Sequence, residues 1–512
     1  MKTGILLLIL DGFGIGSQDV SNPIYISKMK NLHEFFRRYP FGILQASGTS
    51  VGLYWNEAGN CEVGHFTMGT GRAVLQDYVR ALDKVRDENF FSDEKLNSIF
   101  DFAKFNNSNV HIIAPLSLDF HNCPLDVFKM FVEFAKRSGV RSYFHLISDG
   151  YGQEFLKILQ EVESLFNDKV KIATIIGGRY AFDKERSWLL RTKIAFDLIT
   201  KGEGKKRTLE EFKKSLISNF NLKDLDIEPT VINEVALSEN DVLIFLALKE
   251  DEIFQLAKSI LDEDFNFFPR SLPQNLNCLT MVDLPIKEPK YQIEVYLEKI
   301  NIQTSLIREL FLKEKNVFKI TETSRAVPLN FYFNGKITEA YPNEYRKIIP
   351  PTDIYRDFLS GAREIADNIV QAIIDGIYDL IIANIPVTDI VGHTGDINLA
   401  VKLLSELDEL LKDLFEKTIA YNWMVIFTSD HGNIERMTYL ESGKVQKIHD
   451  PNPVPFLIVK KGFEREKTEA QFRYQLKTAV GTLADITPTI LWFFDIPKPD
   501  SMLGKNLTNF IY

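Results

Sequence analysis

Runs of apolar residues that end in a polar turn recur near both ends of the chain. Residues 5–10 (ILLLIL) form the first run. Three later runs have the same form: 379–385, 423–428 and 455–459. The first run is apolar at every position, which is typical of a parallel strand covered on both faces. Between the runs, 354–375 and 398–419 carry apolar residues at steps of three and four, which predicts helices. This alternation indicates a doubly wound α/β domain.

The middle of the chain has an alternation of its own. Its candidate strands are 110–114, 142–147, 171–176 and 242–248, and its candidate helices are 124–137, 153–165, 187–199 and 207–218. We place the limits of this segment near residues 76 and 305. The outer domain is then discontinuous, formed by 1–75 and 306–512, with a second α/β domain, 76–305, inserted in it. A chain of 512 residues is long enough for two such cores.

Composition and charge narrow the class of protein. The formal net charge of −10 argues against a nucleic-acid partner, because such domains usually present a basic surface. Three cysteines in so long a chain do not make a disulfide framework, so we expect a reducing compartment and a cytoplasmic protein. The run 5–10 is too short to span a membrane, and no other stretch reaches the roughly 20 apolar residues required.

Polar residues with ligand chemistry follow the predicted strands of the outer domain. Ligands of open α/β sheets bind beyond the carboxyl ends of the strands. A single aspartate there is more often a turn former, but here aspartates recur with histidines in a chain that has only eight histidines. Carboxylates and imidazoles suit Mn²⁺ or Zn²⁺, and two such ions about 4 Å apart can assist a phosphoryl transfer. The candidate two-metal site comprises Asp11, Cys61, Asp389, His393, Asp430, His431 and His449.

Five segments together resemble one family: ILDGFG, GNCEVGHFTMGTGR, DIVGHTG, TSDHGN and IHDPNPVP. They are similar to the cofactor-independent (2,3-bisphosphoglycerate-independent) phosphoglycerate mutases of the alkaline phosphatase superfamily. The resemblance implies an alkaline-phosphatase-like metal-binding domain and an inserted substrate-binding domain. It also implies two Mn²⁺ or Zn²⁺ ions and interconversion of 3-phosphoglycerate and 2-phosphoglycerate through a phosphoenzyme.

The resemblance also implies a role for each ligand. One ion would be held by Asp389, His393 and His449. The other would be held by Asp11, Asp430, His431 and the nucleophile position. The family has a serine at that position, where this chain has Cys61. A metal-bound thiol is deprotonated, so a phosphocysteine at Cys61 is chemically reasonable. The alternative is a small buried residue, or a ligand without turnover.

The residues that the resemblance implies to contact substrate match the family pattern less closely than the metal ligands do. The candidate substrate-binding residues are His121, Arg179, Lys184, Arg186, Lys249 and Arg325. Tyr151 and Gly152 stand where the family has an Arg-Asp pair, and Glu252 stands where it has an arginine. Replacing arginine by lysine loses bidentate recognition of phosphate or carboxylate, and glutamate reverses the charge.

Three functions remain open from the sequence. The first is a phosphoglycerate mutase that uses Cys61. The second is a metal-dependent phosphatase or phosphodiesterase of the same superfamily, because a pocket without its arginines would admit water to the phosphoenzyme. The third is a non-catalytic relative, which the intact Asp and His set argues against. For either enzyme we expect a small phosphorylated substrate and a monomer, with no membrane partner.

Overall fold

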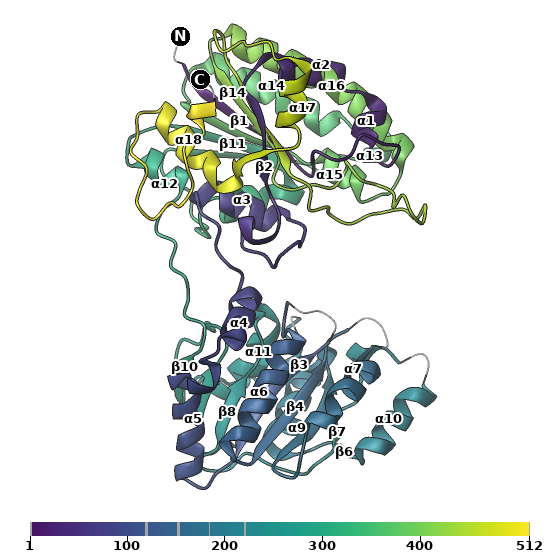
Figure 1. Cartoon of the computed structure of the whole chain (residues 1–512). Helices are drawn as coiled ribbons and strands as arrows, with labels where there is room; N and C mark the ends of the chain where they lie inside the picture. The colour runs from purple at the N-terminus through teal and green to yellow at the C-terminus, as the bar shows by residue number, and fades with distance from the viewer. Residues whose placement is uncertain (1–2, 118–120, 151–153, 184, 220–221, 511–512) are drawn as a thin grey trace. The chain divides into compact units, whose positions relative to one another are not determined.

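The computed structural model describes residues 3–117, 121–150, 154–183, 185–219 and 222–510. The chain divides into two compact units, each shown in Figure 1. Unit 1 consists of residues 1–75 and 301–512, and unit 2 of residues 76–300. The second boundary therefore lies at residue 300, where the sequence pattern placed it near 305.

The core of unit 1 is an eight-stranded sheet. Its strands, in spatial order, are β12 (Glu344–Ile349), β11 (Val317–Glu322), β13 (Leu380–Ile385), β1 (Ile5–Leu10), β14 (Met424–Thr428), β15 (Val454–Val459), β2 (Phe41–Gln45) and β16 (Ala479–Thr482). β1 lies between β13 and β14 and pairs with both in parallel. β15 runs antiparallel to β14 and to β2, so the sheet is mixed although parallel pairs dominate it. The first strand of the chain is thus the centre of the sheet.

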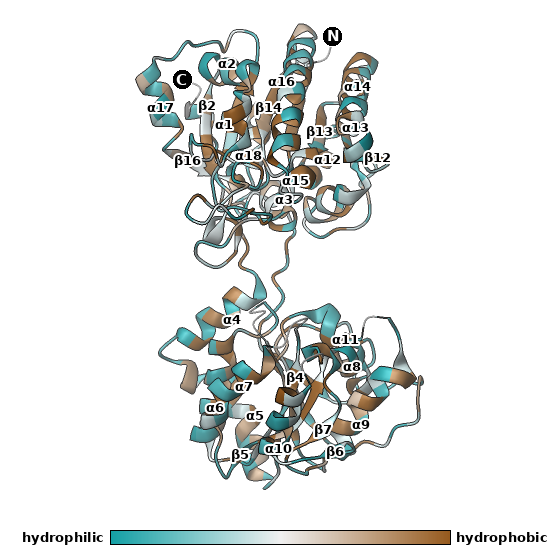
Figure 2. Cartoon of the chain, turned by 90° about the vertical axis from the view of Figure 1, so that its right-hand side faces the viewer, coloured by the Kyte–Doolittle hydropathy of each residue, from teal (hydrophilic) through white to brown (hydrophobic). Residues whose placement is uncertain are grey.

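Helices cover both faces of this sheet. They are α1 (Pro23–Ser27), α2 (Lys30–Arg38), α3 (Cys61–Thr70), α12 (Leu306–Phe311), α13 (Ile354–Asp357), α14 (Ser360–Asp375), α15 (Val387–Gly392), α16 (Ile397–Ala420), α17 (Glu469–Gln475) and α18 (Ile486–Phe493). Leu6, Leu8 and Leu10 of β1 pack in one core with residues of α2, α14 and α16. The alternate residues of β1 are buried as well, which is why the run has no polar position. In Figure 2, α14 and α16 carry both hydrophobic and hydrophilic colour, as amphipathic helices should.

Unit 2 is a second α/β unit with its own eight-stranded sheet. Its strands, in spatial order, are β10 (Gln292–Val295), β9 (Asn277–Thr280), β8 (Val242–Phe245), β3 (Val110–Leu116), β4 (Ser142–Ser148), β5 (Val170–Gly177), β7 (Thr230–Val231) and β6 (Lys205–Lys206). Its helices are α4 (Asp77–Arg86), α5 (Glu94–Phe105), α6 (Leu125–Ser138), α7 (Phe155–Val162), α8 (Gly178–Ala181), α9 (Lys193–Lys201), α10 (Leu209–Ser218) and α11 (Glu250–Leu261). Only the β5–β7 pair is antiparallel among the named strands described here.

The expected elements are present, with three local differences. The helix expected over 354–375 is two helices, α13 and α14. The helix expected over 187–199 begins as a π-helical turn, η4 (Trp188–Thr192), before α9. The strand expected over 242–248 ends at Phe245. Within the described part of the chain, no helix combines the length and the apolar character needed to cross a bilayer.

Candidate functional site

Seven side chains from distant parts of the sequence meet at one edge of the unit 1 sheet. Asp11 follows β1, and Asp430 and His431 follow β14. Asp389 lies on α15, directly after β13, and His393 ends that helix. Because β15 is antiparallel to β14, the segment before it, with His449, reaches the same edge. The sheet topology therefore gathers residues that are more than 400 positions apart.

The first group is a four-residue cluster of Asp11, Cys61, Asp430 and His431. One possible ligand atom of each lies within 4.8 Å of the others. Cys61 Sγ is 3.2 Å from His431 Nε2 and 3.6 Å from Asp11 Oδ1. His431 Nε2 is 3.5 Å from Asp11 Oδ1 and 3.6 Å from Asp430 Oδ2. Cys61 is partly buried, while its three partners are fully buried.

Cys61 is the first residue of the helix α3. The Asn60 side chain caps α3 by accepting hydrogen bonds from the backbone N–H groups of Glu62 and Val63. The amino end of a helix favours negative charge, so this position suits a thiolate. Gly64 is required one turn along, because a Cβ there would meet the backbone of Asp430 at 2.5 Å.

The second group is a three-residue cluster of Asp389, His393 and His449. Their candidate ligand atoms also lie within 4.8 Å of one another. Each of the two His Nε2 atoms is 3.4 Å from an oxygen of Asp389, and the two are 3.1 Å apart. The rings of His431 and His449 stack with centroids 3.9 Å apart, so the two clusters adjoin.

The histidines are oriented by backbone carbonyls. Nδ1 of His393 lies 2.7 Å from the Lys447 carbonyl oxygen, and Nδ1 of His449 lies 2.8 Å from that of Gly59. With a cation bound, a proton on each Nδ1 would leave the lone pairs of the two Nε2 atoms, which lie 3.1 Å apart, free to hold it, as is usual for metal-binding histidines.

A buried oxygen in the four-residue cluster also calls for a cation. Asp430 Oδ2 is buried and accepts no well-formed hydrogen bond within the described structure. His65 Nδ1 lies 3.3 Å from it, but that nitrogen is closer, at 2.8 Å, to the Cys61 carbonyl oxygen. The donor set of both clusters, three carboxylates, three imidazoles and one thiol, therefore fits two divalent cations.

The titratable groups at this edge of the sheet strongly shift one another's pKa values. Burial would raise the pKa of Asp389, but hydrogen bonds from His393 and His449 hold it well below its usual value. Burial would lower the pKa of His431, but Asp430 beside it raises that pKa well above the usual value. Burial raises the pKa of the Cys61 thiol, and Asp11 adds to this effect. Without a cation, the Cys61 thiol and the His431 imidazole therefore both keep their protons.

Arg325 joins the two clusters. It lies in the short helix η6 (Thr323–Arg325) after β11, and its Nε donates to Asp11 Oδ2 at 2.9 Å. Its Nη2 donates to Asp389 Oδ2. The sequence predicted that Arg325 contacts substrate, and the structure places it on two candidate metal ligands. A cationic side chain is thus fixed between the two clusters.

Sequence reasoning did not single out three residues that support the clusters. Asn384, the last but one residue of β13, donates to Asp11 Oδ2 at 2.9 Å, and the same nitrogen lies 3.2 Å from His65 Nε2. Asn433 Nδ2 donates to Asp389 Oδ1 at 2.6 Å. A signal existed for His65, because it follows Cys61 by four positions and so shares its helix face. The two asparagines gave no sequence signal of this kind.

The candidate substrate residues of unit 2 are only partly brought together. Asn122, next to His121, donates to Glu252 Oε2 at 2.8 Å and to Asp149 Oδ2 at 3.4 Å. It also accepts a hydrogen bond from the Lys249 backbone N–H at 3.2 Å. Segments after β3, β4 and β8 therefore meet at the carboxyl edge of this sheet.

Two of the remaining predicted contacts, Arg179 and Arg186, lie within the described residues, and Lys184 does not. Arg179, on α8, pairs with Asp226, and Arg186 has a left-handed backbone with φ of 57°. Lys184, and the Tyr151-Gly152 pair that replaces the family's Arg-Asp, lie outside the described residues.

Comparisons with known proteins agree over the full length. A family model described as "Metalloenzyme superfamily" matches residues 3–498. The 2,3-bisphosphoglycerate-independent phosphoglycerate mutase of Clostridium perfringens (strain SM101 / Type A) is 32% identical over 526 residues, with 99% of each chain covered. That of Clostridium novyi (strain NT) is 31% identical over 520 residues, again with 99% of each covered.

A solved structure shows the fold. Leishmania mexicana phosphoglycerate mutase, determined at low cobalt concentration, matches with a TM-score of 0.67 and 20% identity. The match covers 99% of this chain and 97% of that one. The expected fold class, two α/β units with one inserted in the other, is confirmed. The chain belongs to the metalloenzyme superfamily and, within it, to the family of 2,3-bisphosphoglycerate-independent phosphoglycerate mutases.

Proposed function

We propose that this chain interconverts 3-phosphoglycerate and 2-phosphoglycerate, with Cys61 as the residue that carries the phosphoryl group between the two positions. One observation carries the proposal. Cys61 Sγ lies at the amino end of α3, within 3.6 Å of Asp11 and His431, at the sheet edge where the second cluster adjoins. Family membership indicates the reaction, and this geometry indicates that the Cys61 sulfur is the nucleophilic atom.

Two divalent cations are part of the proposal. Asp11, Asp430, His431 and Cys61 would hold one, and Asp389, His393 and His449 the other. When bound, they supply charge that lowers the thiol pKa and neutralises phosphoryl oxygens. We propose Zn²⁺ before Mn²⁺ for the cluster with Cys61, because thiolate is a soft ligand. Mn²⁺ or Zn²⁺ suits the second cluster equally.

The chemistry then takes two displacements at phosphorus. In the first, the Cys61 sulfur forms a bond to phosphorus, the bond from phosphorus to O3 breaks, and O3 leaves as the 3-hydroxyl of glycerate after taking a proton. In the second, the 2-hydroxyl loses a proton, its oxygen attacks phosphorus, and the bond from phosphorus to sulfur breaks. Thiolate is regenerated, so no oxidant or further reactant is needed.

Arg325 is proposed to bind the phosphoryl group in transit. Its guanidinium has donors in a planar fork that matches two phosphoryl oxygens. Asp11 and Asp389 orient it at the point where the two clusters meet. In unit 2, Arg179, Arg186, Lys249 and His121 remain predicted substrate contacts, joined by Lys184.

One observation favours a second candidate, a metal-dependent phosphatase. Glu252 brings a carboxylate to the carboxyl edge of the unit 2 sheet, 3.7 Å from Lys249 Nζ and hydrogen-bonded to Asn122. A negative charge at a proposed phosphoglycerate contact weakens the hold on the intermediate, so water could take the phosphoryl group. The same metal clusters and the same Cys61 would then give hydrolysis.

Phosphorus NMR separates the two functions in one sample. The metal-loaded protein is incubated with 3-phosphoglycerate, and the signals of 3-phosphoglycerate, 2-phosphoglycerate and inorganic phosphate are followed together. Appearance of 2-phosphoglycerate supports the mutase, and appearance of inorganic phosphate alone supports the phosphatase. A sample in which neither forms, although two metal ions are bound, would overturn both.

Cysteine variants test the nucleophile. Cys61→Ala should lose turnover in that assay, while Cys61→Ser, which restores the family's hydroxyl, should retain part of it. The matched control is Cys278→Ser, since Cys278 is a free and buried cysteine of unit 2. Cys61 is not the nucleophile if Cys61→Ala keeps full turnover, or if mass spectrometry of the trapped phosphoenzyme finds the phosphoryl group on another residue.

A further inference from the structure

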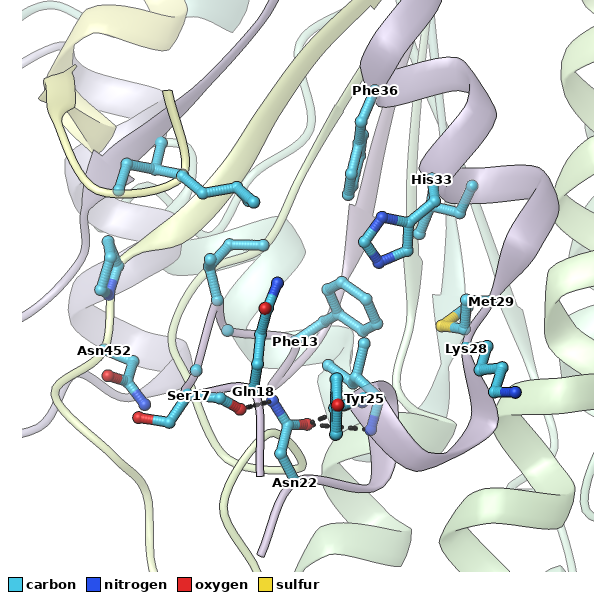
Figure 3. A pocket seen from close by; sticks show the side chains of 18 of the residues that line it. Phe13, Ser17, Gln18, Asn22, Tyr25, Lys28, Met29, His33, Phe36 and Asn452 are labelled. Carbon is cyan, nitrogen blue, oxygen red and sulfur yellow. Dashed lines mark hydrogen bonds between the residues drawn. The ribbon is translucent and has the colours of Figure 1, made fainter. Parts of the chain in front are cut away.

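A large cavity lies within unit 1, and none of the seven candidate metal ligands lines it. Its volume is about 1120 Å³. The loop after β1, the helices α1 and α2, the end of α17 and the segment before β15 form its walls. Figure 3 shows part of this lining, with the rings of Phe13, His33 and Phe36 between α2 and the loop after β1. Drug-sized ligands occupy cavities of roughly 300 to 1,000 Å³, so the space suffices for one.

The inner wall of the cavity is apolar. Phe13, Met29, Leu32, Phe36 and Ile43 line it, and each is at most 3% exposed. Leu476, Ile15 and Ile24 extend this surface towards the rim. The inner residues are already covered, so the apolar surface that a ligand would remove from water belongs to the half-buried Ile15, Ile24 and Leu476.

The charged residues that line the cavity are all basic. Lys28, Arg473 and Lys477 line it, and none of the described lining residues is an aspartate or glutamate. Arg473 has a partner, because its Nε donates to Glu469 at 2.8 Å. For Lys28 and Lys477, no ion pair occurs among the described residues. The ammonium groups of Lys28 and Lys477, beside an apolar wall, can therefore pair with an anionic ligand.

The backbone fixes one of these lysines at the rim. Lys28 and Met29 both have left-handed backbones, with φ of 67° and 30°. A non-glycine pair in this region costs free energy and persists only where the surrounding structure maintains it. Asn22 caps the start of α1, and the Lys28 backbone N–H bonds to the Ile24 carbonyl at its end. The pair thus turns the chain so that Lys28 faces solvent while Met29 is buried in the cavity wall.

We propose that this cavity is a binding site for an organic anion with an apolar body, such as a carboxylate on a medium-length alkyl chain. The alkyl chain lies against Ile15, Ile24 and Leu476, and the anionic group lies at the rim with Lys28 and Lys477. His33, whose pKa burial lowers and Arg37 lowers further, stays neutral there and can hydrogen-bond the ligand. The inference does not rest on the proposed mutase activity, because the site shares no candidate ligand with the metal clusters.

A pair of amphiphiles with opposite charge tests the site. The metal-loaded full chain is titrated by calorimetry with decanoate and, separately, with decyltrimethylammonium, both below their micelle concentrations. We expect one decanoate per chain with a Kd on the order of 0.1 mM. Decyltrimethylammonium should bind at least roughly tenfold more weakly, because its charge is repelled at the rim. Equal binding of both would overturn the proposal, as would the absence of decanoate binding.

Variants locate the binding. Lys28→Glu and Lys477→Glu should each weaken decanoate binding by about five- to tenfold. Leu476→Trp should weaken it as well, because the larger ring fills part of the cavity. Lys461→Glu is the matched control, an exposed lysine outside the lining, and should bind decanoate as the parent does. Circular dichroism confirms that each variant is folded. Unchanged affinity in both Lys28→Glu and Lys477→Glu would place decanoate elsewhere and overturn the assignment.

Discussion

Both units hold a group of histidines next to an aspartate, but the two groups are built differently. In unit 1, His393, His431 and His449 lie beyond strand ends, with carboxylates on one side and backbone carbonyls on the other. In unit 2, His111 and His145 lie within strands β3 and β4. His145 Nε2 is 3.0 Å from His111 Nδ1, and His145 Nδ1 is 2.9 Å from Thr174 Oγ1.

The difference shows that position in the sheet decides what a histidine does. Both nitrogens of His145 are engaged by side chains inside the protein, and the residue is buried. His111 Nε2 faces Asp241 Oδ2 at 3.3 Å, and Asp241 in turn accepts the backbone N–H groups of Asn109 and Ser238. This series of contacts holds strands and loops of unit 2 together. At the unit 1 edge, by contrast, the Nε2 atoms converge on carboxylates, and the arrangement could hold a cation.

The largest expected effect comes from exchanging one aspartate in each group. Asp430→Asn should lower turnover of 3-phosphoglycerate by roughly three orders of magnitude or more, because a ligand carboxylate is lost. Asp241→Asn should leave turnover per folded molecule within about twofold, since it alters only a structural contact. Comparable losses in both variants would remove the distinction between the two groups. The measurement is the rate of 2-phosphoglycerate formation.

Metal content gives the next largest effect. Dialysed and reloaded protein should carry two divalent ions per chain by plasma mass spectrometry. His393→Ala should retain one of them, because it removes one of three ligands from the three-residue cluster. His145→Asn, the matched change in unit 2, should retain both. A parent protein that binds a single ion, or none, contradicts the assignment of the clusters.

The supporting asparagines should matter less than the ligands. Asn384→Leu and Asn433→Leu each remove a hydrogen bond to a candidate ligand carboxylate. Such partners typically contribute 10- to 100-fold to metal affinity, so we expect losses of about that size in Zn²⁺ competition titrations. Asn233→Leu serves as the comparison in unit 2, because its side chain bonds only to the Ile172 carbonyl. It should not alter metal affinity.

The smallest effect is a pH dependence confined to unit 2. Burial, and then His111, lower the folded-state pKa of His145 well below 6.5. As the pH falls, this histidine therefore gains its proton in the unfolded chain before it does so in the folded chain. The contribution of His145 to the free energy of unfolding is then complete above about pH 6.5 and decreases below it. The loss should be about 1.4 kcal/mol for each pH unit until the folded pKa is reached. Hydrogen exchange of β4 amides in urea should show it, and His145→Asn should flatten the dependence.

The sequence was sufficient for the fold class and the family. Mostly apolar runs identified β1, β13 and β14, because a strand covered on both faces carries few polar positions. The strand-end rule then predicted that Asp11, Asp389 and Asp430 would meet, and these are brought together in the structure. Their role as metal ligands, and that of Cys61 as nucleophile, stay predictions.

Other features depend on distant contacts and left no sequence pattern. Arg325 bridges Asp11 and Asp389 only because β11, β13 and β1 lie side by side. The reversal of β15 has no signature, since a buried strand reads the same in either direction. The roles of Asn384 and Asn433 become visible only when their partners, Asp11 and Asp389, are known. The cavity beside Phe13 arises from five separate segments, so no single stretch predicts it.

The central position of β1 has a consequence for synthesis on the ribosome. β1 is complete at residue 10, but its neighbour β13 begins at residue 380. At 5 to 20 residues per second, the central strand of unit 1 waits roughly 20 to 70 seconds for its first partner. Unit 2, residues 76–300, has all its strands long before then. During synthesis, residues 5–10 therefore stay an apolar segment without their strand partners while all the strands of unit 2 become available.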